Sequence, residues 1–299
     1  MGKTGSATTP IDAAWLRAHP LPRHGEGTDK NSRGRVLVVG GSRMVPGGLR
    51  LTAEAALRAG AGKVQLATVE GCALMLGMAV PEAGVIALPE AGDGEIDARG
   101  AERLAEAVAD CDTLLVGPAM TGKARAGALL DALLDAGSLP GCVVLDAAAI
   151  PAARERAERL RALPGHLVIT ANDGEMAALL GRELDAVDAD PESAVSEAAA
   201  RFGAVVLLKR GDTLVSAPEG QMLCYSGGGA GLATGGSGDV LAGLNAALIA
   251  RGQEPLSAAA WGVWLHGEAG RGLAGSVGPL GFLARELTAL VPRLLAEGL

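Results

Sequence analysis

The sequence predicts an α/β fold in which helices cover both faces of a mostly parallel central sheet, with an antiparallel hairpin at one edge. First, short aliphatic runs recur without polar alternation, as over residues 35–40, and such runs are typical of strands buried on both faces. Second, these runs alternate with helical segments, which is the order of parallel βαβ units. Third, Pro218-Glu219-Gly220 separates two late strands and favours a hairpin.

The individual elements follow in order along the chain. We expect strands over residues 35–40, 63–68, 85–88, 113–116, 142–145, 167–170, 205–209, 213–216 and 221–224. We expect helices over residues 49–59, 101–109, 124–134, 174–180 and 192–202, and a mostly helical chain after Asp239. Residues 1–33 are polar and interrupted by proline and glycine. They predict a flexible N-terminal arm with a short helix near residues 13–18, followed by a single catalytic domain over residues 34–299.

The composition limits the classes of function. The formal net charge is -8 and only 2% of the residues are aromatic. Because nucleic-acid binding needs a basic surface and stacking aromatics, we expect no nucleic-acid partner. The four cysteines are widely spaced, and this argues against a zinc site or a disulfide framework. A leader and an apolar run of membrane-spanning length are not evident, so we expect a cytoplasmic protein without a membrane partner.

The most informative motif is the glycine-rich run over residues 233–243, which leads into an apolar helical segment. Backbone N–H groups at Gly236, Ser237 and Gly238 are expected to form an anion hole, because a helix N-terminus with flexible glycines favours phosphate. Asp239 then lies next to the phosphate, where a carboxylate can take the proton of an attacking hydroxyl. The competing interpretation is an ordinary turn, with Asp239 offsetting the helix dipole.

Further candidate residues follow the predicted strands, at the edge where parallel sheets bind ligands. The segment from Lys209 to Thr213 is either a solvated turn or part of a nucleotide site. Asp146 either faces the crevice, through water or a metal ion, or caps a helix. Glu175 either pairs with a helix dipole or contacts magnesium through water. We interpret His266, in an apolar helical segment, as a packed core histidine.

Taken together, these elements resemble the ribokinase-like fold, and within it the ADP- or ATP-dependent NAD(P)H-hydrate dehydratases, a carbohydrate-kinase-like family. The similar segments are VLVVGGS with PGG over residues 36–48, AEAALRAGAG over 53–62, ATGGSGDVLAG over 233–243, and residues 265–267. The resemblance implies that a hydroxyl on the reduced nicotinamide ring of the hydrate (NADHX or NADPHX) is phosphorylated by ADP or ATP. Phosphate then leaves and the ring double bond returns. It also implies Mg²⁺ bridging the phosphates and a homo-oligomer.

The resemblance assigns roles to particular positions. Asp239 would be the base, and Gly236, Ser237 and Gly238 would hold the transferred phosphate. The implied nucleotide-binding residues are Lys209, Arg210, Gly211, Asp212 and Thr213, together with Gly238. The implied hydrate-binding residues are Gly48, Gly117 and Asn172, together with Asp239.

Four loops depart from the family's motifs. Asn172 stands where the family has histidine, Ala119 and Gly229 where it has glycine and asparagine, and Ala148 where it has a second aspartate. Two alternatives therefore stay open: a kinase of the same fold that phosphorylates another small alcohol, and a nucleotide-binding protein without catalysis.

Overall fold

The computed structural model describes residues 8–23, 25 and 27–298. Its centre is one ten-stranded sheet, with the order β1-β10-β9-β8-β7-β6-β5-β2-β3-β4. The strands are β1 (Thr9–Pro10), β2 (Arg35–Val39), β3 (Lys63–Val69), β4 (Gly84–Leu88), β5 (Thr113–Val116), β6 (Cys142–Leu145), β7 (His166–Asn172), β8 (Val205–Lys209), β9 (Asp212–Ser216) and β10 (Met222–Ser226). Strand β9 pairs antiparallel with both β8 and β10, and the other pairings are parallel. The α/β fold class and the hairpin are therefore confirmed.

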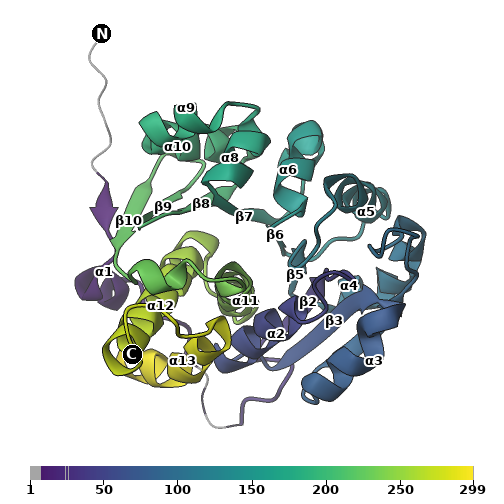
Figure 1. The fold of residues 1–299 in the computed structure, drawn as a ribbon, viewed down its shortest axis with the longest axis horizontal. Coiled ribbons are helices and arrows are strands. Elements are labelled where there is room, and N and C mark those ends of the chain that lie inside the picture. The colour runs from purple at the N-terminus through teal and green to yellow at the C-terminus, as the bar shows by residue number, and fades with distance from the viewer. Residues whose placement is uncertain (1–7, 24, 26, 299) are drawn as a thin grey trace.

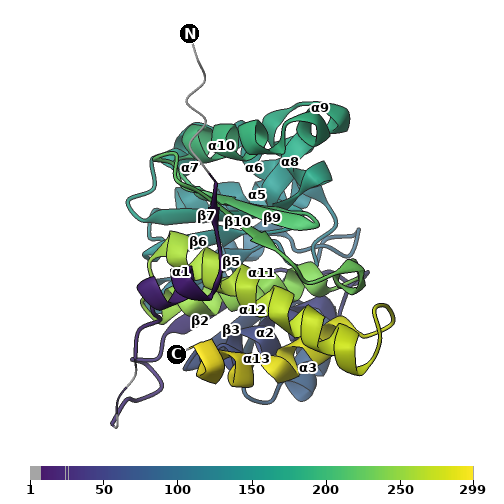
Figure 2. The ribbon, with the colours of Figure 1, turned by 90° about the vertical axis from the view of Figure 1, so that its left-hand side faces the viewer.

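Helices cover both faces of this sheet, as Figures 1 and 2 show. The α-helices are α1 (Ala13–Ala18), α2 (Gly48–Arg58), α3 (Glu70–Ala79), α4 (Ala105–Asp110), α5 (Lys123–Asp135), α6 (Ala149–Ala153), α7 (Ala157–Arg161), α8 (Asp173–Leu180), α9 (Leu184–Ala189), α10 (Pro191–Phe202), α11 (Ser237–Ala250), α12 (Pro255–Ser276) and α13 (Ala284–Gly298). Three 3₁₀ segments are η1 (Ala98–Leu104), η2 (Arg154–Arg156) and η3 (Ala230–Leu232). One face carries α2, α11, α12 and α13, and the other carries α5, α6, α8 and α10.

The sequence missed some helices and merged others. Helix α3 was not expected, because its residues are apolar around most of the helix and give no amphipathic period; Leu74 and Met78 stay exposed. The helix expected over 101–109 is divided between η1 and α4. The short helices α6, α7 and α9 were also not expected.

The segment before residue 34 contributes to the sheet and to the core. Strand β1 adds to the sheet edge beside β10, and α1 forms over 13–18 as expected. Trp15 and Leu16 of α1 are buried in the main cluster, and the indole Nε1 of Trp261 in α12 donates to the His19 carbonyl over 2.7 Å. Burial of these apolar side chains draws the described part of the expected arm onto the domain.

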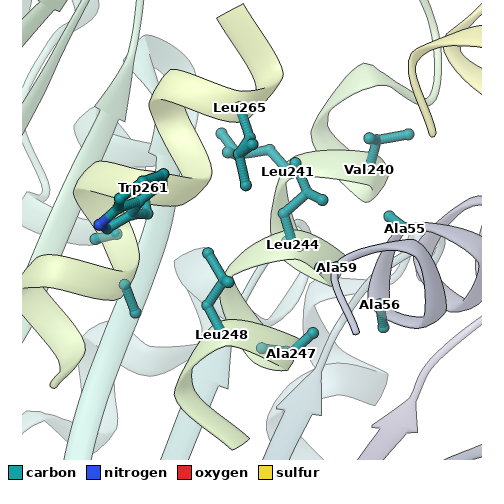
Figure 3. Packing of buried hydrophobic residues seen from close by; sticks show 14 of the residues in the cluster. Ala55, Ala56, Ala59, Val240, Leu241, Leu244, Ala247, Leu248, Trp261 and Leu265 are labelled. Atoms are coloured by element: carbon teal, nitrogen blue, oxygen red, sulfur yellow. The ribbon is translucent and has the colours of Figure 1, made fainter. Parts of the chain in front are cut away.

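In the core between α2 and α11, α2 presents the small residues Ala55 and Ala56 (Figure 3). A Cβ at Gly243 of α11 would lie 2.3 Å from the Thr52 carbonyl oxygen of α2 and 3.0 Å from Ala55 Cβ. Glycine is therefore required for this close approach. The approach fixes α11, whose N-terminus carries Asp239, against α2 and the sheet.

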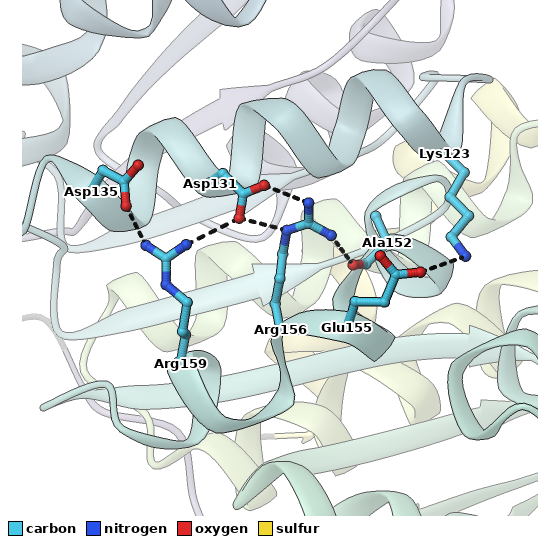
Figure 4. Close-up of polar contacts among 7 residues, drawn as sticks. All are labelled: Lys123, Asp131, Asp135, Ala152, Glu155, Arg156 and Arg159. Atoms are coloured by element: carbon cyan, nitrogen blue, oxygen red, sulfur yellow. Dashed lines mark hydrogen bonds and ion pairs between the residues drawn. The ribbon is translucent and has the colours of Figure 1, made fainter.

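On the opposite face, ion pairs join neighbouring helices (Figure 4). Arg156 and Arg159 both pair with Asp131 of α5, and Arg159 also pairs with Asp135. The pairs of Arg159 are largely exposed, so each contributes little to stability, on the order of 0–1 kcal/mol, while the Arg156 side chain is more buried.

The order of the strands defines where a ligand crevice opens. The chain leaves β2 toward β3 and β4 on one side, and returns to β5 on the other side of β2. Open α/β sheets bind ligands at such a switch. Here the loops that follow β2 and β5, residues 40–47 and 117–122, contact each other, since the Gly41 N–H donates to the Pro118 carbonyl over 2.8 Å. Within the described residues, none of the helices combines the length and apolar character that crossing a membrane requires.

Candidate active site

The first turn of α11 has the shape expected of an anion-binding helix N-terminus. Gly236 is the N-cap and adopts a φ of +88°, a left-handed conformation that glycine tolerates best. The Ser237 N–H is used inside the turn, where it donates to the Thr234 carbonyl over 3.2 Å. The remaining first-turn N–H groups lack acceptors within the helix and can face a ligand, together with the positive end of the helix dipole.

Lys209 at the end of β8 lies against this turn and between two carboxylates. Its Nζ is 3.2 Å from Asp146 Oδ1 and 3.7 Å from Glu175 Oε2. A Cβ built at Gly238 would lie 3.4 Å from the same Nζ, so the glycine leaves room for the ammonium group. Burial alone would lower the pKa of Lys209, but the charges of Asp146 and Glu175 outweigh burial and raise it. Lys209 is thus a fixed positive charge beside the anion-binding turn.

Asp146 and Glu175 each form contacts that the sequence interpretations did not include. The Asp146 side chain is 3% exposed and accepts from Thr170 Oγ1 over 2.6 Å as well as from Lys209. It does not cap a helix, since Ala148 is the N-cap of α6. Glu175 forms a capping box with Asn172 at the start of α8, with both bonds at 2.8 Å. Burial raises the pKa of Glu175, while Lys209 opposes this shift.

Asp239, in the first turn of α11, is partly buried and faces these charges. Burial first, and then the negative charge of Asp146, raise the pKa of Asp239 to about 7. Lys209 and a backbone hydrogen bond from Ala119 act in the opposite direction. A carboxyl group with a pKa near 7 can exchange a proton at neutral pH, which is what a general base requires.

His266 of α12 contacts the anion-binding turn directly. Its Nε2 lies 2.8 Å from Ser237 Oγ and 3.1 Å from the Ser237 carbonyl oxygen. Burial lowers the pKa of His266 to about 4, so the ring is neutral at physiological pH. The histidine has hydrogen-bond partners, as the core interpretation expected, and it also lines the cavity described next.

A cavity of about 710 Å³ opens between the β8–β9 region and α11 and α12. It collects most of the residues expected at the nucleotide and phosphate sites, namely Lys209, Arg210, Gly211, Thr213, Ser237 and Gly238, together with Asn172, which was expected to bind the hydrate. Asp212 does not line it, and neither do Gly236, Asp239, Asp146 and Glu175. Arg210 reaches the wall while paired with Asp173 of α8 and Asp188 of α9, at 3.3 and 3.2 Å. The cavity lies on one side of the 236–239 turn.

Gly48 and Gly117, at the switch between β2 and β5, do not line this cavity. A Cβ at Gly48 would lie 2.4 Å from Ala119 Cβ, and one at Gly117 would lie 2.0 Å from the Asp146 carbonyl oxygen. Asn172 instead lines the cavity and uses its side chain to cap α8. Of the three positions Gly48, Gly117 and Asn172, Asn172 alone lines the cavity.

Sequence reasoning missed two contacts near Asp239. One is the hydrogen bond between Ser237 and His266, although the resemblance had included residues 265–267. The other joins Glu95, which follows β4, to Thr121 in the loop after β5. No sequence motif connects either pair.

The carboxylates here do not form a direct metal-ligand set. Across residues 8–23, 25 and 27–298, no group of three histidine, cysteine, aspartate or glutamate side chains is arranged to hold a metal ion. Oxygen ligands suit Mg²⁺, but the ammonium of Lys209 lies between Asp146 and Glu175 and engages both. Direct coordination by this pair does not fit the structure.

Comparisons with known proteins identify the family of this chain. The family model for NAD(P)H-hydrate dehydratases matches residues 36–293. A protein from Xanthomonas campestris pv. campestris, the ADP-dependent (S)-NAD(P)H-hydrate dehydratase, is 45% identical over 293 residues, which cover 98% of each chain. A ribokinase-like superfamily protein from Enterococcus faecalis has the same fold, with a TM-score of 0.82 and 23% identity, covering 100% of this chain and 98% of that one.

A further similar structure is the ADP/ATP-dependent NAD(P)H-hydrate dehydratase of Bacillus subtilis, co-crystallised with ATP and Mg²⁺. Its TM-score is 0.81 and its identity 24%, and the match covers 98% of this chain and 100% of that one. Because the family model and the 45% identical relative both extend over most of the sequence, this chain belongs to the NAD(P)H-hydrate dehydratase family.

Proposed function

We propose that this protein dehydrates the hydrates of NADH and NADPH at the expense of ADP or ATP. Membership of the family supports this substrate class, and the 45% identical relative is named for the ADP-dependent reaction on the S hydrate. The observation that carries the proposal is the position of Asp239. Its carboxyl group, with a pKa raised to about 7, lies beside an anion-binding helix N-terminus and accepts a hydrogen bond from the turn at the switch point.

The first step is phosphoryl transfer to the ring hydroxyl. The nucleotide occupies the 710 Å³ cavity, with its terminal phosphate against Gly236, Ser237 and Gly238. Asp239 takes the hydroxyl proton as the hydroxyl oxygen attacks phosphorus, and the bond from phosphorus to the nucleotide breaks. Lys209 and the helix dipole stabilise the negative charge on the transferring group. Because burial keeps its ring neutral, His266 is not a general acid in this step, but it fixes the Ser237 side chain.

The second step is elimination. The ring carbon–oxygen bond breaks, phosphate leaves with the bonding electron pair, and a proton is lost from the neighbouring carbon as the ring double bond forms. With ADP the products are the reduced dinucleotide, AMP and phosphate. Mg²⁺ would enter bound to the nucleotide and neutralise its phosphate oxygens, since Lys209 engages the nearby carboxylates.

The single catalytic domain over 34–299, the cytoplasmic location and the homo-oligomer are further parts of this proposal.

The test is an assay of purified protein with NADH hydrate, Mg²⁺ and either ADP or ATP. We expect the absorbance of the dihydropyridine to return as AMP or ADP and phosphate are released. Asp239→Asn should lower kcat by about 10²–10⁴-fold, the usual contribution of a general base, while nucleotide binding measured by calorimetry persists.

Two results would favour the alternatives. A stable phosphorylated product without recovery of absorbance would indicate a kinase. Nucleotide binding without turnover of the hydrate or of other alcohols would indicate a binding protein. Equal activity of Asp239→Asn and the wild type would refute the assignment of the base.

A further inference from the structure

The turn that contacts Asp239 is strained. The Met120 N–H donates to the Gly117 carbonyl over 3.1 Å, closing a four-residue turn with Pro118 in its second position. Ala119, in the third position, has a φ of +57°. Turns of this shape prefer glycine there, since a side chain makes the left-handed conformation cost roughly 1–2 kcal/mol.

The strained residue is also the one that reaches the active site. Ala119 contributes the backbone hydrogen bond to Asp239, and its methyl group packs where a Cβ on Gly48 would collide. A small rotation of this turn would therefore move a hydrogen-bond donor away from the carboxylate. Misplacing a catalytic group by about 1 Å can reduce the rate by about 10²-fold.

Contacts from the loop after β2 hold one side of the turn. The Gly41 N–H donates to the Pro118 carbonyl over 2.8 Å, and Ser42 Oγ donates to the Ala119 carbonyl over 3.1 Å. Both contacts act on carbonyl oxygens. They leave the far end of the turn, at Thr121, to be fixed by another part of the chain.

Glu95 supplies that contact from the segment after β4. Its side chain is buried, with the residue 4% exposed, and its Oε1 accepts from the Thr121 N–H over 3.0 Å and also from Thr121 Oγ1. The Ala91 N–H in turn donates to the Glu95 carbonyl over 2.9 Å, so the backbone that carries the carboxylate is itself fixed.

The second carboxylate oxygen of Glu95 shows that this contact is costly. Among the described residues, Oε2 is buried and has no hydrogen-bond partner. An unsatisfied buried oxygen costs about 1–3 kcal/mol, and an alanine at this position would avoid that cost. The side chain therefore does more than fill space.

We propose that Glu95 is a positioning residue that, by holding Thr121, keeps the strained turn over 117–121 in the shape that directs the Ala119 N–H at Asp239. This inference rests on the proposed function and adds to it a buried carboxylate from a different loop. Glu95 itself touches neither nucleotide nor hydrate in this assignment; it acts through the backbone of the turn.

The kinetic test compares Glu95→Ala with Glu95→Gln. The amide oxygen of glutamine can still accept from Thr121, so Glu95→Gln should keep kcat within about threefold of the wild type, a difference of less than 1 kcal/mol. Glu95→Ala should lower kcat by roughly tenfold or more and leave the KM for the nucleotide unchanged, because the cavity residues are not altered. Its pH–rate profile should shift to higher pH, since the hydrogen bond that lowers the pKa of Asp239 is lost.

Two further variants distinguish loss of the positioning contact from general misfolding. In the Glu95→Ala background, Ala119→Gly should recover part of kcat, because glycine adopts the turn without strain. Thr121→Val removes the hydroxyl contact alone and should give a smaller loss than Glu95→Ala.

A measurement without turnover separates this inference from the proposed function. Carbon-13 NMR of labelled aspartate, with the Asp239 signal identified by its loss in Asp239→Asn, gives the titration of that carboxyl group directly. The pKa of Asp239 should rise in Glu95→Ala and stay unchanged in Glu95→Gln. If the hydrate is not turned over but this shift is seen, the function is wrong and the positioning role stands. If Glu95→Ala lowers only the melting temperature, with kcat, KM and the titration unchanged, the positioning role is refuted.

Discussion

Two loops meet at Asp239 and reach their shapes by different physical routes. The turn before α11 has Gly236 at a φ of +88°, a conformation that the absence of a side chain makes accessible. The turn after β5 places Ala119 at +57°, a conformation that its methyl group opposes. The first turn is encoded locally, while the second depends on Gly41, Ser42 and Glu95 from distant loops. The comparison teaches that the two sides of this site should respond differently to substitution.

The largest loss of activity is expected from a substitution at Gly236, whose conformation is set by its own residue type. Gly236→Val places a β-branched side chain at positive φ, and its Cβ would lie 2.3 Å from Leu51 Cδ1. We expect kcat/KM to fall by roughly 10²-fold as the anion-binding turn is displaced. The neighbouring Gly235→Val is the matched control, because a Cβ there meets nothing within 4 Å and φ is not positive. Equal loss in both variants would contradict the local explanation.

The carboxyl group of Asp239 should make the free energy of unfolding depend on pH, because folding raises its pKa. The folded protein raises the pKa of Asp239 from 3.8 to about 7. The folded state therefore binds more protons than the unfolded state between these values, and its stability falls as pH rises through this range. Asp239→Asn removes this penalty, so at pH 8 we expect the variant to be more stable than the wild type by on the order of 2 kcal/mol.

The advantage should shrink toward pH 4, where the carboxyl group is protonated in the folded protein. Urea denaturation of both proteins at several pH values measures this. A variant that is less stable at pH 8 than the wild type would show that Asp239 is held by favourable contacts, and not opposed by burial.

The smallest effect is expected at the strained turn. Ala119→Gly relieves strain of roughly 1–2 kcal/mol, but it also frees the unfolded chain and removes a packed methyl group. We expect the free energy of unfolding to change by less than about 0.5 kcal/mol. Ala132→Gly in α5 is the control and should cost about 1 kcal/mol, as glycine does in helices. If both substitutions destabilise the protein equally in chemical denaturation, Ala119 is not strained.

Much of the fold could be predicted because the strands are unusually regular. Residues 113–116 and 142–145 are buried along their whole length, and each is an aliphatic run between turn residues. The same reasoning failed at α3, since Leu74 and Met78 give apolar character on the exposed side, so that no period marks the helix. It also failed for the described part of the N-terminal segment, which packs through Trp15 although its sequence is mostly polar.

Some features of the candidate active site could also be predicted from the sequence, and others could not. The glycine-rich run predicted the helix N-terminus and the position of Asp239 within it, since both follow from neighbours in the chain. The association of Lys209 with two carboxylates could not be predicted, because it depends on which strands lie side by side. The capping box between Asn172 and Glu175 is instead a local contact over three positions.

By itself, the sequence determined the order of strands β2 to β10, the hairpin, and a glycine turn that can receive an anion, because periodicity and glycine conformations act over a few residues. Only the tertiary structure decided what surrounds Asp239. Ser237 meets His266 across 29 positions, and Thr121 meets Glu95 across 26, through contacts that exist only when the sheet has assembled. Burial and charge, which set the pKa of the carboxyl group, come from these distant segments and from no local pattern.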